Sequence, residues 1–100
     1  MLINRRTFNV RPGCMEEIIQ LVKDIGRDVG SLPSGARETR LSTALFGPFD
    51  VLVTEVEFEN MEQYQQYWNE AFSHPAAKKF FETWEKLIAG GGTNEIWEVR

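Results

Sequence analysis

The apolar residues of this chain of 100 residues change their spacing several times, and each change marks a new element. Residues 2–10 alternate loosely between two faces, which predicts a strand. From Met15 to Val29 the apolar positions recur in steps of three and four, which predicts an amphipathic helix. Pro12 and Gly13 separate the two elements. Pro12 suits the first turn of the helix, because its missing N–H needs no partner there.

A turn-rich segment at 30–35 separates that helix from two further alternating runs. Residues 37–46 and 51–59 each alternate, and only residues 47–50 lie between them. Strands joined by so short a connection pair antiparallel, so we expect a β-hairpin. In the second strand, one face carries Leu52, Thr54, Val56 and Phe58, and the other carries Val51, Val53, Glu55, Glu57 and Glu59.

The second half of the chain is predicted to form a broken helix and a last strand. Asn60 is a favourable N-cap residue, and an aromatic-rich helical stripe follows it. The dipeptide His74–Pro75 interrupts this stripe, because the residue before a proline avoids helical dihedral angles. Helical spacing resumes over 77–88, and the glycines at 90–92 end it before a strand over 94–100.

The predicted order of elements is β-α-β-β-α-β, which is typical of the ferredoxin-like α+β fold. This fold has a four-stranded antiparallel sheet with both helices on one face, and we expect residues 1–100 to form one such domain. The other face, which carries Thr7, Val51 and Val53 among glutamates, is left without cover. A partly apolar face of this kind is often buried against another subunit, so we expect a homodimer with two-fold symmetry.

The composition narrows the class of protein further. The chain is 42% hydrophobic, 26% charged and 12% aromatic, a balance typical of soluble globular domains. The net charge of −4 argues against a nucleic-acid partner. No apolar run is long enough to span a membrane, and the chain turns polar at Asn4, without the apolar centre of a signal peptide. A single cysteine makes the cytoplasm the simplest location.

Several segments resemble proteins of the NIPSNAP family. The segment 6–13 has an arginine, a threonine, an aromatic residue and then an Arg-Pro-Gly turn, as does the start of those proteins. The Phe-Gly-Pro turn at 46–48 before the strand 51–59, the helix break at Pro75 and the closing strand 95–100 are also similar. The resemblance covers nearly the whole chain.

This resemblance implies membership of the dimeric α+β barrel superfamily. That superfamily also holds antibiotic-biosynthesis monooxygenases, haem-degrading oxygenases and stress-responsive barrels. It implies that the four-stranded sheets of two chains associate into one barrel. It also implies that each subunit has a ligand cavity between its sheet and its helices.

The resemblance to the haem-degrading members bears on Asn4 and Trp68. In those members an asparagine of the first strand, a tryptophan of the second helix and a later histidine line the haem pocket. Asn4 and Trp68 stand at the matching places, but the histidine would fall near residues 78–80, where this chain has none. Haem iron commonly takes a histidine ligand, so haem degradation becomes a minor alternative. The other interpretation is that the Asn4 side chain forms hydrogen bonds with a neighbouring strand and that Trp68 packs in the core.

His74 is the only histidine, and its unperturbed charge changes near neutral pH. It could serve as a proton shuttle with Glu70, one helical turn earlier. The favoured alternative is that it caps or is solvated locally at the helix break. We therefore take His74, Asn4 and Trp68 as the candidate catalytic residues.

Aromatic residues are dense in the second helical region, where helical spacing places most of them in the core. Some could line a pocket for a flat ligand. Arg6 shares a strand face with Phe8, and a buried arginine needs an acidic or carbonyl partner. An internal ion pair and the capture of an anionic ligand both stay open. The candidate ligand-binding residues are Arg6, Phe8, Phe46, Tyr64, Tyr67 and Trp84.

We therefore expect a NIPSNAP-like homodimer that binds a small aromatic or apolar molecule. One alternative is a cofactor-independent monooxygenase of the antibiotic-biosynthesis type, which would need no metal or flavin motif. Another is a dimerisation module with a filled core. We expect no cofactor, and one histidine and one cysteine leave no room for a multi-ligand metal site of these residues within one chain.

Overall fold

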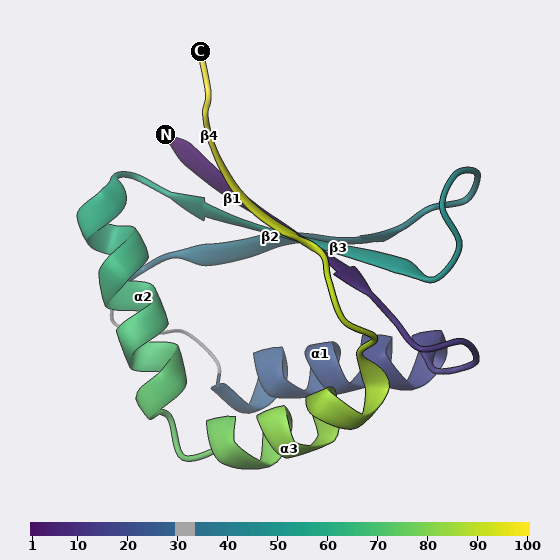
Figure 1. Ribbon diagram of the computed structural model, residues 1–100. Coiled ribbons are helices and arrows are strands. Elements are labelled where there is room, and N and C mark those ends of the chain that lie inside the picture. Colours follow the sequence, from purple (N-terminus) through teal and green to yellow (C-terminus); the bar gives the residue numbers. More distant parts are fainter. Residues whose placement is uncertain (30–33) are drawn as a thin grey trace.

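The computed structural model describes residues 1–29 and 34–100, which form one sheet and three helices (Figure 1). The elements in chain order are β1 (Leu2–Asn9), α1 (Met15–Val29), β2 (Arg37–Thr43), β3 (Val51–Phe58), α2 (Met61–Ser73), α3 (Ala77–Leu87) and β4 (Thr93–Glu98). The predicted order of strands and helices is confirmed, with the second helical region divided at His74–Pro75. The predicted turn at 30–35 lies partly outside the described residues.

The strands pair antiparallel in the order β2-β3-β1-β4, and the three helices cover one face of the sheet (Figure 1). This is the predicted ferredoxin-like α+β architecture. None of the helices in the described part of the chain combines the length and apolar character that crossing a lipid bilayer would require.

Several predicted boundaries are wrong. The strand expected over 37–46 ends at Thr43, because Thr43 pairs with Leu52 and β3 begins only one residue earlier, at Val51. Residues 44–50 therefore form a loop that projects from the sheet (Figure 1). The helix expected to take Pro12 into its first turn begins at Met15, so Pro12 lies in the preceding turn. The last strand covers 93–98, not 94–100.

The core lies between the sheet and the helices α1 and α3. The predicted inner face of β3 is confirmed, since Leu52, Val56 and Phe58 are buried. Ile18 and Val22 of α1 are buried with them, because the apolar stripe of that helix faces the sheet. Ile18, Val22 and Leu52 form one core cluster with Val10 and Leu87.

The opposite face of the sheet carries a row of alternating charges across all four strands. Arg40 of β2 stands opposite Glu55 of β3, Glu55 opposite Arg5 of β1, and Arg5 opposite Glu95 of β4. The Arg5 guanidinium lies 3.6 Å from the Glu55 carboxylate. Glu55 is buried, with 8% of its surface exposed. Opposite charges in directly paired positions stabilise a sheet by about 0.2–1 kcal/mol per pair. No helix covers this face (Figure 1).

The predicted end of the helix at glycines 90–92 is also the point where the chain returns to the sheet. Gly92 has a φ of +112°, and a Cβ atom there would overlap the carbonyl oxygen of Thr7. Only glycine allows this approach, which starts the pairing of β4 with β1 at Thr93 and Thr7.

Candidate functional site

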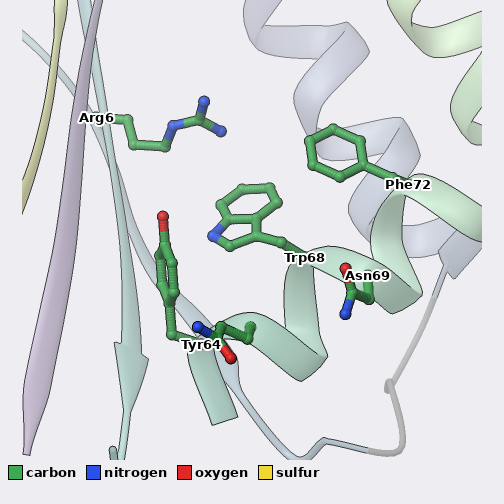
Figure 2. A pocket seen from close by; sticks show the side chains of 6 residues that line it. Arg6, Tyr64, Trp68, Asn69 and Phe72 are labelled. Atoms are coloured by element: carbon green, nitrogen blue, oxygen red, sulfur yellow. The ribbon is translucent and has the colours of Figure 1, made fainter. Parts of the chain in front are cut away.

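Two adjoining cavities lie between the sheet and the helices. The outer cavity, of about 350 Å³, is lined by Arg6, Tyr64, Gln65, Trp68, Asn69 and Phe72 (Figure 2). The inner cavity, of about 250 Å³, receives side chains from β1, β3 and all three helices. Its lining comprises Arg6, Phe8, Val22, Ile25, Gly26, Val29, Ala36, Thr54, Val56, Tyr67, Trp68, Ala71, Ala77, Phe80, Phe81 and Trp84. Arg6 and Trp68 line both cavities, so they form the wall between them.

Small residues of all three helices line the inner cavity. Gly26 of α1 is exposed at the edge of this cavity, and a Cβ atom built there meets nothing within 4 Å. Ala71 of α2 and Ala77 of α3 face the same space. Larger side chains at these positions would fill the cavity, so the volume is encoded by where the small residues fall.

A continuous chain of aromatic rings forms much of the cavity wall. Eight ring contacts, with centroids 4.8–5.7 Å apart, link nine rings. In order of contact they are Phe8, Trp84, Phe80, Phe81, Phe72, Trp68, Tyr67, Phe58 and Tyr64. Edge-to-face and tilted contacts of this kind add to the stability gained from burial alone. We refer to this set as the ring chain.

Arg6 brings a positive charge into this aromatic surrounding. Its guanidinium carbon lies 4.6 Å from the centre of the Trp68 ring and 5.4 Å from that of Phe8. Burial lowers the pKa of the Arg6 guanidinium, and the nearby Tyr64 and Tyr67 act in the opposite direction. An arginine nevertheless stays protonated under all conditions in which proteins fold. The wall between the cavities is therefore permanently cationic.

The structure does not bring the predicted catalytic residues together. Of the three, only Trp68 lines a cavity. Asn4 is 0% exposed, and its Nδ2 donates to Asn94 Oδ1 at 2.7 Å and to the Glu95 carbonyl at 2.9 Å. Asn4 thus ties β1 to β4, which was the structural alternative for it. The haem pocket implied by the resemblance is accordingly not assembled from these residues.

His74 lies at the break between α2 and α3. Its Nδ1 accepts a hydrogen bond from the Ala76 backbone N–H at 3.1 Å, so the ring caps its own loop. Glu70, its predicted partner, instead accepts from the Ser34 backbone N–H at 3.1 Å and from Gln66 Nε2 at 3.3 Å. The local capping role is therefore the one that the geometry supports.

Five of the six predicted ligand-binding residues line a cavity, namely Arg6, Phe8, Tyr64, Tyr67 and Trp84. The sixth, Phe46, is 92% exposed in the loop 44–50, because β2 ends before reaching it. The sequence prediction missed the polar lining residues Gln65 and Asn69 and the small residues of the inner cavity. Small residues on an apolar helical stripe are the signal that could have located that cavity.

Among the side chains of residues 1–29, 34–36 and 40–100, no three His, Cys, Asp or Glu groups come together as a metal site would require.

The chain is similar in structure to several solved proteins. It superposes on a NIPSNAP family protein from Agrobacterium tumefaciens with a TM-score of 0.86 and 16% identity, over 99% of this chain and 85% of that one. For a NIPSNAP domain protein from Burkholderia xenovorans the TM-score is 0.82 and the identity 17%, over 100% and 95% of the two chains. For a candidate antibiotic biosynthesis monooxygenase from Caulobacter crescentus the TM-score is 0.77 and the identity 14%, over 99% of this chain and 89% of that one.

These similarities confirm the predicted fold, which the chain shares with solved NIPSNAP proteins and with candidate antibiotic biosynthesis monooxygenases. The sequence itself matches no protein-family model and no curated protein. Function must therefore be argued from the site.

The capping role of His74 can be tested by substitution. We expect His74→Ala to lower the free energy of unfolding by about 0.5–1.5 kcal/mol, because one partly buried hydrogen bond is lost. Binding of the neutral fluorescent probe N-phenyl-1-naphthylamine should stay unchanged, because His74 lines neither cavity. His74→Asn should retain most of the stability, since an Asn side chain can accept the same bond. Loss of probe binding in a folded His74→Ala protein would contradict this interpretation.

Proposed function

We propose that this protein binds a small aromatic or apolar molecule in the inner cavity. The observation that carries the proposal is the cavity of about 250 Å³ between sheet and helices, lined mainly by apolar and aromatic side chains. Cavities with apolar walls and few polar groups are the usual form of small-molecule sites in proteins. The open volume argues against the alternative of a dimerisation module with a filled core.

The shape of the walls limits the ligand. Typical sites for drug-sized ligands measure about 300–1,000 Å³, so the inner cavity alone suits a body of one or two fused rings. A larger ring system would extend past Arg6 and Trp68 into the outer cavity. Rings of the ring chain, including Phe8, Trp68 and Trp84, would meet such a body by edge or face contacts.

Filling the inner cavity should remove binding without harming the fold. We expect Gly26→Leu to abolish the fluorescence increase of N-phenyl-1-naphthylamine, because the new side chain would occupy the open space at this position. The same change should raise the free energy of unfolding by about 1 kcal/mol, since glycine is unfavourable inside a helix.

The matched control for this experiment is Lys23→Leu. It adds a leucine to an exposed position of the same helix and should leave probe binding unchanged. Undiminished binding to Gly26→Leu would place the probe outside the inner cavity and contradict the proposal.

We also propose that the chain forms a homodimer through the uncovered face of the sheet. The face carries Val51, Val53 and Thr7 beside the row of alternating charges. Trp97, which is 53% exposed, stands opposite Ile3 on the same face. Apolar surface left open in this way is favourable to bury, and a two-fold axis lets the row of charges meet a second, identical row.

A charge placed at the centre of this face should separate the two chains. We expect the wild-type protein to have twice the mass of one chain in light scattering at micromolar concentration, and Val53→Arg to have the mass of one chain. Circular dichroism checks that the variant is folded. Met61→Glu, an exposed position at the start of α2, is the control and should stay dimeric. A wild-type mass of one chain would overturn the proposal.

A cofactor-independent monooxygenase reaction is the second candidate function. It is supported by the likeness in fold to candidate antibiotic biosynthesis monooxygenases and by the fixed positive charge of Arg6, which would stabilise a substrate that reacts with oxygen as its anion.

The reaction can be assayed with anthrone. Each anthrone would consume one molecule of O₂ and give one anthraquinone and one water, measured by an oxygen electrode and by anthraquinone absorbance. We expect uptake above the spontaneous rate, and none of this excess with Gly26→Leu. Equal rates for wild type and Gly26→Leu would exclude the reaction for this substrate.

A further inference from the structure

We propose that the ligand of the inner cavity carries one negative charge, a carboxylate in the simplest case, and that Arg6 binds it. The inference rests on the proposed binding function and names its substrate class: aromatic or apolar monocarboxylates.

Arg6 has aromatic neighbours but no anionic partner. Its guanidinium lies over the rings of Trp68 and Phe8. Among the described residues it forms no ion pair and donates no hydrogen bond, and the described lining of the two cavities includes no acidic side chain. Ring contacts attract the charge, but they provide no hydrogen-bond acceptor for the N–H donors of the guanidinium among the described residues.

The adjacent arginine, Arg5, has the acidic partner that Arg6 lacks. Arg5 points to the opposite face, where it lies 3.6 Å from Glu55 and stands opposite Glu95. Buried or partly buried charges in proteins are normally paired in this way, because an isolated charge is costly to remove from water. Arg6 departs from the rule at the place where a ligand would lie, so the missing partner is best supplied by the ligand itself.

The geometry favours a carboxylate. A guanidinium presents paired N–H donors that match the two oxygens of a carboxylate. Arg6 is the one cationic side chain among the described lining residues, so a single negative charge balances it. In Figure 2 the guanidinium lies above Trp68, and the Tyr64 hydroxyl is turned toward the Arg6 side chain. Both Tyr64 and Asn69 line the outer cavity and could donate to the same group.

The two cavities then have separate roles. The apolar body of the ligand would fill the inner cavity, and its carboxylate would lie at the wall formed by Arg6 and Trp68. The polar side chains Gln65 and Asn69 of the outer cavity would surround the charged end and its water. This orientation follows from placing each part of the ligand in the surroundings that solvate it best.

The experiment compares two ligands that differ only in charge. 2-Naphthoate and 2-naphthamide are nearly equal in size, and each is measured by isothermal titration calorimetry and by displacement of N-phenyl-1-naphthylamine. We expect wild type to bind 2-naphthoate about tenfold or more tightly than 2-naphthamide. A charge-assisted hydrogen bond between the Arg6 guanidinium and the carboxylate would account for a difference in affinity of this size. In Arg6→Met the ratio should fall to about one, because the methionine keeps the apolar contact and loses the charge.

Two further measurements separate a ligand-binding arginine from a structural one. Lys86→Met removes an exposed positive charge of α3 and should leave the ratio unchanged, which controls for net charge. Without ligand, Arg6→Met should raise Tm by a few degrees, because it removes a charge that lacks a partner. A structural arginine would show the reverse.

The outcomes distinguish this inference from the proposed function. If the neutral compounds bind and 2-naphthoate shows no advantage, the anionic class is wrong and the proposed function stands. If none of the compounds binds, both are wrong. An unchanged ratio or a lowered Tm in Arg6→Met would also overturn the role given to Arg6.

Discussion

All three helices in the described part of the chain pack against the same face of a four-stranded sheet, and most other features depend on that constraint. The covered face holds the core of Ile18, Leu52 and Leu87 and, beside it, the inner cavity. The uncovered face is stabilised by pairing charges between neighbouring strands instead of by burial under a helix. Because side chains alternate along a strand, adjacent residues such as Arg5 and Arg6 enter these two very different environments.

The site combines features that oppose the stability of the free protein. Gly26 weakens a helix, the inner cavity forgoes packing contacts, and Arg6 is half-buried without a carboxylate partner among the described residues. Binding sites commonly retain such costs, because a ligand restores the missing contacts. The ring chain offsets part of the cost by fixing the walls from one end of the cavity to the other.

Much of the fold could be predicted from the sequence, because the spacing of apolar residues reports directly on strands and helices. The strand over 37–46 was too long in the prediction, since alternation alone cannot show that β3 offers no partner beyond Val51. For the site, Arg6 and most aromatic residues could be predicted from the face they share. For Asn4 the sequence left a catalytic and a structural role open, because the choice depends on partners such as Asn94, which is remote from Asn4 in the chain.

The ring chain has one more consequence. Nine of the twelve aromatic residues belong to it, whereas Phe46, Phe49 and Trp97 are exposed. Each ring between the two ends of the ring chain contacts a neighbour on either side, so the shape of the cavity depends on all nine rings together. Free-energy changes at contacting rings do not add. A relative of this protein could therefore bind a ligand of different shape only after several of these aromatic residues were substituted together. The residues of the wall are thus expected to change as a group during evolution.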